Sequence, residues 1–147
     1  TSIIFETMLK REKWLDTPRD AQWLRVQEHL AETGKLVRSS IEEARSKGQR
    51  VIGYGASHSP TTLSYALSIE SSLDFIIDDN VTRQGLYAPG TGCKVASPKM
   101  LGENPEALVI ILAWQHGPKI VDNLIRLRFR GSVIMPFPSF SKDVFNG

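Results

Sequence analysis

A short apolar run that ends in two glycines constrains this chain more than any other feature. The run Val51-Ile52-Gly53-Tyr54-Gly55 is followed by small and hydroxyl residues and then by a helical pattern from Thr61. This order predicts a strand, a tight turn and the beginning of a helix. In an open α/β sheet such a turn holds a phosphate or a nucleotide, because the free N–H groups and the positive end of the helix dipole point at it. The sequence therefore predicts a site for a small anionic ligand.

Strand-like and helix-like segments alternate after this turn. Further strands are expected over Leu73–Asp78, Ala107–Ala113 and Ser132–Met135, with helices over Thr61–Ser68, from Pro98, and over Pro118–Phe129. The continuous apolar run Ala107–Ala113 indicates a strand buried on both faces, as in a parallel sheet. This alternation predicts an α/β fold, a Rossmann-like three-layer domain with a mostly parallel sheet.

A long helix is expected before the sheet. Thr17 and Pro18 are suited to begin it and Gly48 to end it. Its apolar residues recur at steps of three and four and form one stripe: Trp23, Val26, Leu30, Gly34, Val37, Ile41 and Ala44. Gly34 weakens a helix by about 1 kcal/mol relative to Ala, so either close packing or a helix break is expected there. Residues 1–16 have no clean period and are expected to form an arm or linker before a domain of residues 17–147.

Charge and composition exclude several classes of partner. The net charge of +2 gives no electrostatic case for nucleic acid, and the basic residues Arg126, Arg128 and Arg130 suit the end of a helix. Cys93 is the one cysteine, which excludes an internal disulfide and fits a reducing compartment. No apolar run is long enough for a bilayer, and no spacing resembles a zinc site. We therefore expect a cytoplasmic protein with no membrane partner and no metal.

Ligands of such sheets bind beyond the carboxyl ends of the strands, so four loops are expected to line one crevice. They begin at Gly55, Asp78, Trp114 and Pro136. No catalytic residue is assigned. The candidate ligand-binding residues lie in or beside these loops and are Gly53, Tyr54, Gly55, Ala56, Ser57, His58, Thr61, Asp78, Asp79, Asn80, Gln84, Tyr87 and Trp114.

Each candidate has a structural alternative. Asp78 lies near the position where such folds bind a ribose hydroxyl, and Tyr87 offers a ring and a hydroxyl to a sugar. Trp114 is placed to stack on a base or sugar, or else to pack in the core. His58 is suited to donate to a phosphate or to act as an acid or base, and His116 is expected to cap the last helix. The alternative for the acidic loop is a turn that Asp79 and Asn80 merely begin.

Several segments together resemble one family. They are Gly53-Tyr54-Gly55-Ala56-Ser57 with Thr61-Thr62-Leu63, Asp74–Asn80, Gln84–Thr91, Leu112-Ala113-Trp114 and Gly131–Pro136. From about Asp20 to Phe137 the chain resembles the C-terminal domain of bacterial nucleotide-sugar C-methyltransferases. The most specific part runs from Asp79-Asn80 through Gln84-Gly85 to Gly90-Thr91.

The resemblance implies a Rossmann-like domain that helps to hold a nucleotide-linked sugar. It also implies that a zinc-binding region, a methyl-donor-binding domain and the general base lie elsewhere in a longer enzyme. S-adenosylmethionine is then expected only in the donor-binding domain, and this chain alone is expected to transfer no methyl group. Where the family commonly has Lys-Gly, this sequence has Ser59 and Pro60, which removes a charge and an N–H donor suited to phosphate.

Two other functions remain open from the residues alone. One is an oxidoreductase-like domain that binds NAD(P), although the third glycine of that fingerprint is replaced by His58. The other is a non-catalytic interaction module that docks through the arm of residues 1–16 and the first helix. The chain begins at Thr1 without Met, so we expect either a piece of a longer enzyme or a stand-alone relative.

Overall fold

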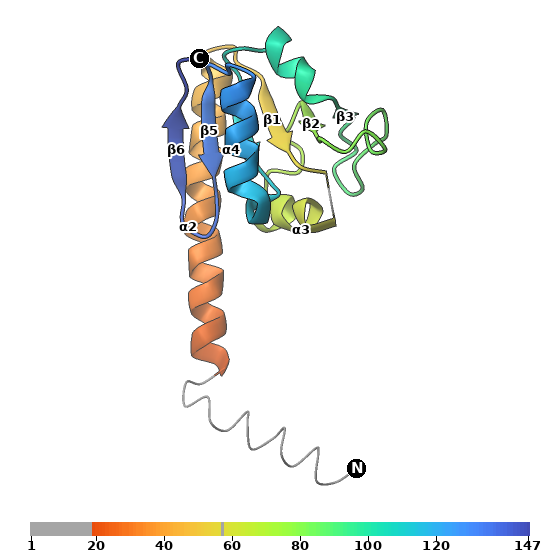
Figure 1. Ribbon diagram of the computed structural model, residues 1–147. Coiled ribbons are helices and arrows are strands. Elements are labelled where there is room, and N and C mark those ends of the chain that lie inside the picture. The colour runs from red at the N-terminus through yellow and green to blue at the C-terminus, as the bar shows by residue number, and fades with distance from the viewer. Residues whose placement is uncertain (1–18, 57) are drawn as a thin grey trace.

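The computed structural model describes residues 19–56 and 58–147, without the side chains of residues 19, 20 and 58–60. Within these residues, six strands form one sheet in the order β3-β2-β1-β4-β5-β6 (Figure 1). The strands are β1 Val51–Tyr54, β2 Phe75–Ile77, β3 Val95–Ala96, β4 Leu108–Ile111, β5 Ser132–Met135 and β6 Ser141–Val144. All neighbouring pairs are parallel except β5 with β6. The expected arm of residues 1–16 lies outside the described residues.

Helices cover both faces of the sheet. The helices α2 (Arg19–Ser46) and α3 (His58–Ala66) pack on one face. The helix α4 (Gly117–Arg126) and the short 3-10 helix η1 (Pro98–Glu103) pack on the other, and a second 3-10 helix, η2 (Trp114–His116), leads into α4. This arrangement confirms the predicted α/β fold with three layers, a mostly parallel sheet and a long first helix (Figure 1).

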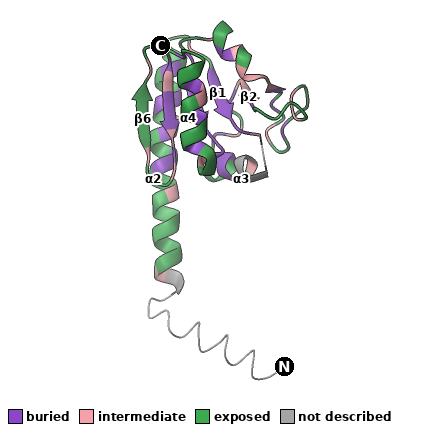
Figure 2. Ribbon diagram, viewed as in Figure 1, coloured by how far each residue is buried: buried purple, intermediate pink, exposed green. Residues whose placement is uncertain are grey.

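The central strands are buried on both sides, as their apolar runs predict. Every residue of β4 and of β1 is buried, and β1 is purple in Figure 2. Alternate residues of β4 enter two separate cores, with Ile110 facing α2 and α3 and Val109 facing α4. Because both faces of these central strands are covered by apolar side chains, we look for the candidate site at the loops beyond the strand ends.

The apolar stripe of α2 is buried along only part of its length. Val37, Ile41 and Ala44 pack on the sheet, whereas Trp23 is 61% exposed and Val26 48% exposed. Figures 1 and 2 show the reason: the N-terminal half of α2 projects beyond the edge at which β5 ends.

The helix α2 is continuous through Gly34, so close packing and not a break accounts for this glycine. A Cβ at Gly34 would lie 3.2 Å from the carbonyl oxygen of Leu67 and 2.8 Å from a guanidinium nitrogen of Arg38. That Arg38 nitrogen donates to the same carbonyl at 2.6 Å. The glycine therefore lets α2 approach the end of α3.

Two strands were not expected from the sequence. The strand β3 has two residues and follows a turn-rich segment, and β6 follows Pro138. The residues of β6 are all exposed, so they carry no alternation of apolar and polar positions. A 2.7 Å ion pair between Lys142 and Glu43 ties β6 to α2. The hydrogen bond from Lys142, followed by that from Lys47, lowers the pKa of Glu43 to about 2.

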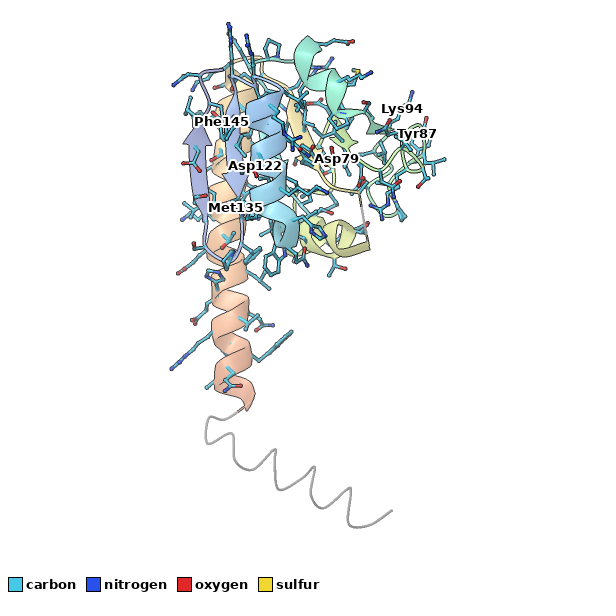
Figure 3. The ribbon with its side chains drawn as sticks, viewed as in Figure 1. Asp79, Tyr87, Lys94, Asp122, Met135 and Phe145 are labelled. Carbon is cyan, nitrogen blue, oxygen red and sulfur yellow. The ribbon has the colours of Figure 1, made fainter. Side chains whose placement is uncertain are left out.

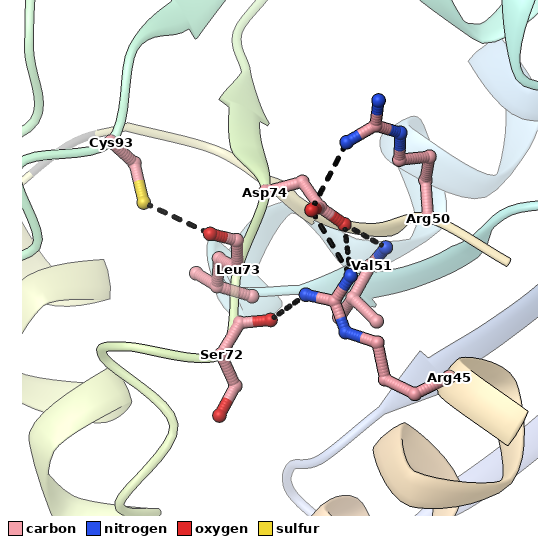
Figure 4. Close-up of polar contacts among 7 residues, drawn as sticks. All are labelled: Arg45, Arg50, Val51, Ser72, Leu73, Asp74 and Cys93. Carbon is pink, nitrogen blue, oxygen red and sulfur yellow. Dashed lines mark hydrogen bonds and ion pairs between the residues drawn. The ribbon is translucent and has the colours of Figure 1, made fainter. Parts of the chain in front are cut away.

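A carboxylate joins the three elements that meet where β1 begins. The Val51 N–H donates to Asp74 at 2.7 Å, and the guanidinium groups of Arg45 and Arg50 approach the same carboxylate at 3.0 and 3.3 Å (Figure 4). Burial raises the pKa of Asp74, but the bond from Val51 and the two arginines outweigh it and hold that pKa below its ordinary value. Asp74 thus fixes the end of α2 and the beginning of β1 against the segment that enters β2.

Candidate functional site

A cavity of about 220 Å³ opens where β1, β2 and β4 end. The strands β1 and β4 are neighbours in the sheet. After β1 the chain continues into α3 on one face of the sheet, and after β4 it continues into α4 on the opposite face. This divergence is the point at which open α/β sheets bind ligands. We call this space the polar cavity; its lining residues are Tyr54, Gly55, Asp78, Asp79, Arg83, Ala113, His116, Lys119 and Ile120.

The turn after β1 requires the glycine that the sequence places there. Gly55 has a φ of +102°, a conformation that residues with a Cβ rarely adopt. A Cβ at Gly55 would also lie 2.4 Å from the Cβ of Ala113, which follows β4. The Gly55 N–H donates to the carbonyl of Ile77 at 2.7 Å. The turn is therefore pressed between the ends of β2 and β4, at the base of the polar cavity.

Asp78 is buried, and its carboxylate oxygens bond to other groups of the protein. It accepts hydrogen bonds from the Ala56 N–H at 2.7 Å and the Asn80 N–H at 2.8 Å, and it pairs with Arg83 at 3.1 Å. Only 6% of the residue is exposed. The oxygens proposed from sequence for a ribose hydroxyl thus hold the β1–α3 turn and Arg83 in place.

Asp79, labelled in Figure 3, is exposed, and its carboxylate belongs to a short polar network. The Tyr54 hydroxyl donates to one carboxylate oxygen at 2.9 Å, and the Asn123 side-chain amide donates to the other at 3.0 Å. Arg126 donates in turn to the Asn123 oxygen at 2.7 Å. Burial raises the pKa of Tyr54 far above its ordinary value, so the hydroxyl stays a donor. Because a carboxylate has about four acceptor positions, Asp79 retains capacity for a ligand.

A second cavity of about 200 Å³ adjoins the first. Its lining is mostly apolar and we call it the apolar cavity; the residues are Ala56, Arg83, Leu86, Tyr87, Ala88, Pro89 and Val95. Helix α3 anchors its outer loop, since the Thr61 hydroxyl donates to the Pro89 carbonyl at 3.0 Å and the Tyr65 hydroxyl to the Gly90 carbonyl at 2.8 Å. Thr61 therefore has a structural partner in the loop that carries Tyr87.

Several other candidate residues take part in contacts within the protein itself. Gly53 lies in the core, where a Cβ would lie 2.7 Å from Leu112 Cδ1, so its position does not support a ligand contact. The Gln84 amide donates to the Asp78 carbonyl at 2.9 Å, and the Asn80 side-chain oxygen accepts from Thr82. Ser57 and the side chain of His58 lie outside the described residues.

Trp114 and His116 both follow β4, and for Trp114 the structure shows the packing alternative. Trp114 packs against the core beneath α2 and α3, with its ring centroid 6.3 Å from that of Phe137, and it does not line the polar cavity. His116 does occupy the N-cap position of α4, but its side chain makes no capping hydrogen bond among the described residues. His116 is thus the N-cap residue of α4, as expected, but it lines the polar cavity and its side chain does not bond to the described helix end.

Sequence reasoning missed the two cations of the polar cavity, Arg83 and Lys119. Arg83 lies in a turn-rich segment without periodicity, and Lys119 in the first turn of α4. The signal for Lys119 was its place in the first turn of the helix that follows β4, a strand that ends at the crevice.

A search of the described residues finds no group of three or more His, Cys, Asp and Glu side chains able to hold a metal ion. No helix in that part of the chain is both long and apolar enough to cross a membrane. The predicted cytoplasmic location stays a prediction.

Comparison with known proteins now identifies the family. The family model described as the C-methyltransferase C-terminal domain matches residues 2–138. The chain belongs to this family. Among curated proteins, C-methyltransferase NovU from Streptomyces niveus is 30% identical over 110 residues, which cover 74% of this chain and 25% of NovU. This member of the C-methyltransferase C-terminal domain family thus spans about a quarter of the length of the curated relative that it matches.

Among solved structures, UDP-D-quinovosamine 4-dehydrogenase from Vibrio fischeri aligns with 58% of this chain and 77% of its own, with a TM-score of 0.40 and 19% identity. For this C-methyltransferase C-terminal domain, the fold class rests on its own strand order and layers.

Proposed function

We propose that this domain binds a nucleotide-linked sugar within a SAM-dependent sugar C-methyltransferase and has no methyltransferase activity by itself. The observation that carries the proposal is the polar cavity, which places the Asp79 carboxylate beside the cations Arg83 and Lys119. Sugar hydroxyls need acceptors such as a carboxylate, and phosphates need cationic donors. A nucleotide sugar carries both groups, so this cavity suits its chemistry.

The two cations also account for the departure from the family pattern at Ser59 and Pro60. A lysine at that position would bring a charge to the loop after β1. In this chain, Arg83 from the loop after β2 and Lys119 from α4 bring charge to the same edge of the sheet. Phosphate binding in this proposal depends on them and on the Gly55–Ala56 turn.

The methyl donor and its binding domain belong, in this proposal, to another part of a longer enzyme. NovU is a C-methyltransferase by name, and this chain matches about a quarter of it. The exposed half of α2 supports a protein partner, because Trp23, Leu24 and Val26 are each about half exposed or more. Large apolar side chains gathered on a projecting helix are typical of a protein interface.

Calorimetric titration tests the ligand class. We expect UDP-glucose or dTDP-glucose to bind the chain more tightly than NAD⁺ or NADP⁺. Replacing Lys119 by Ala should weaken the sugar nucleotide about tenfold, because a hydrogen bond to a charged group contributes about 1.5 kcal/mol or more. The same replacement at Lys35, on α2, is the matched control and should leave affinity unchanged. Clear NAD⁺ binding without a sugar-nucleotide signal would support the oxidoreductase-like alternative instead.

The proposal also predicts that the chain does not retain S-adenosylmethionine. Equilibrium dialysis with the labelled donor measures this directly. Free and protein-containing compartments should equilibrate to the same concentration of label, with UDP-glucose present or absent. Retention of one donor per chain would contradict the assignment of the donor to another domain.

A further inference from the structure

The polar and apolar cavities meet at one side chain. Arg83 lines both of them. The turn after β1 is divided in the same way, with Gly55 in the lining of the polar cavity and Ala56 in that of the apolar cavity. The two cavities are therefore halves of one crevice, separated by Arg83 and the Gly55–Ala56 turn.

Arg83 is fixed at this boundary. Among the described residues its guanidinium group bonds only to Asp78, through one nitrogen at 3.1 Å. Asp78 is itself held by the Ala56 N–H, so the turn and Arg83 share one buried anchor. The side chain of Arg83 remains 41% exposed. Its other N–H groups form a planar fork that matches the oxygens of a phosphate.

The two halves differ in chemistry and not in size, at about 220 and 200 Å³. The polar half holds Asp79, which Tyr54 and Asn123 position while leaving it acceptor capacity for hydroxyl groups. The apolar half is bordered by Leu86, 59% exposed, and Tyr87, 70% exposed. Exposed aromatic and aliphatic side chains at a cavity suit a flat ring that stacks and excludes water.

We propose that a nucleotide sugar lies across Arg83, with its nucleobase in the apolar cavity against Tyr87 and its sugar hydroxyls on Asp79. The diphosphate then lies over the Gly55–Ala56 turn, at the Arg83 guanidinium. This inference rests on the proposed function and adds the direction of the ligand. The reverse direction would place most sugar hydroxyls against Leu86, Ala88 and Pro89, whose side chains offer no hydrogen bond, and would leave them the Tyr87 hydroxyl.

Titration with UDP-glucose and with UDP separates the two ends of the ligand. Replacing Tyr87 by Ala should weaken both ligands equally, by at least about fivefold, because base stacking contributes about 1 kcal/mol or more. Replacing Asp79 by Asn should weaken UDP-glucose about tenfold and leave UDP within about twofold, because the contact involves only the sugar. Tyr87→Phe keeps the ring and should bind both ligands as the native chain does. Asp122→Asn, the same change at an exposed position of α4, is the control for Asp79→Asn.

The melting temperature of each variant shows whether it is folded. If the melting temperature of Asp79→Asn is well below that of the native chain, Asn123→Ala is the substitute variant. It keeps the Asp79 carboxylate but removes one of its hydrogen-bond donors, and it should weaken UDP-glucose more than UDP. The inference would be overturned by the opposite pattern, in which Asp79→Asn weakens UDP and Tyr87→Ala weakens UDP-glucose but not UDP. That result would mean that the ligand lies in the reverse direction. Unchanged affinities in both variants would also overturn the inference. If the native chain binds neither UDP-glucose nor dTDP-glucose, the proposed function itself fails.

Discussion

Replacing Gly55 by Ala should lower the free energy of unfolding by about 3–5 kcal/mol, which for a chain of this size lowers the melting temperature by about 6–20 °C. Two costs add at this position. The φ of +102° is unfavourable for any residue with a Cβ, and the new methyl would lie 2.4 Å from the Cβ of buried Ala113. Thermal denaturation followed by circular dichroism measures the change. Since the same turn lies under Arg83, affinity for UDP-glucose should fall with it.

Gly85→Ala is the matched control for this variant. Gly85 also has a positive φ, +84°, but a Cβ there would meet no atom within 4 Å. This control therefore carries the conformational cost without the overlap, and it should lose only about 1 kcal/mol. If Gly55→Ala is no less stable than Gly85→Ala, the end of β4 can move away and the turn does not depend on close approach.

The fold was predictable where burial imposes a pattern. The run Ala107–Ala113 gave β4 because a strand buried on both faces must be apolar throughout. Short edge strands carry no such pattern, so the two residues of β3 and the exposed residues of β6 were missed. The stripe of α2 predicted the helix but not its burial, because period alone cannot tell where the sheet stops and the helix projects.

The candidate site was predictable at the level of loops and not of single side chains. The expectation that strand ends meet placed Tyr54, Gly55, Asp78 and Asp79 together, and all four line the polar cavity. Sequence could not tell that Asp78, and not Asp79, has its carboxylate bonded to the turn after β1 and to Arg83. That depends on where the Ala56 N–H and Arg83 lie in space. Sequence also could not tell that Trp114, at the start of η2, would pack against the core under α2 and α3 and not line the polar cavity.

Replacing Asp74 by Ala should lower the free energy of unfolding by about 2–3 kcal/mol at pH 7, a shift of roughly 4–12 °C in melting temperature. The cost comes mainly from the Val51 N–H, which loses its partner at 2.7 Å at the beginning of a buried strand. Arg45 and Arg50 lose an ion pair as well, but their side chains are 44% and 62% exposed, so solvent screens most of that contribution. Urea denaturation at neutral pH measures the difference.

A second replacement, Asp74→Asn, removes the charge alone, and the pH dependence of its stability tests the cause. The pKa of Asp74 is lower in the folded chain than the value of about 3.9 expected for an unfolded one, so the carboxylate stabilises the fold fully above about pH 5. That contribution should disappear as the pH falls through the folded-state pKa, and the gap between the native chain and Asp74→Asn should narrow over this range. The exposed control Asp122→Asn should remain parallel to the native chain. Salt should be added to screen the exposed Glu43 pair, whose carboxyl also titrates in acid, with a pKa of about 2. A gap between the native chain and Asp74→Asn that stays constant down to pH 2 would mean that the charge of Asp74 does not stabilise this junction.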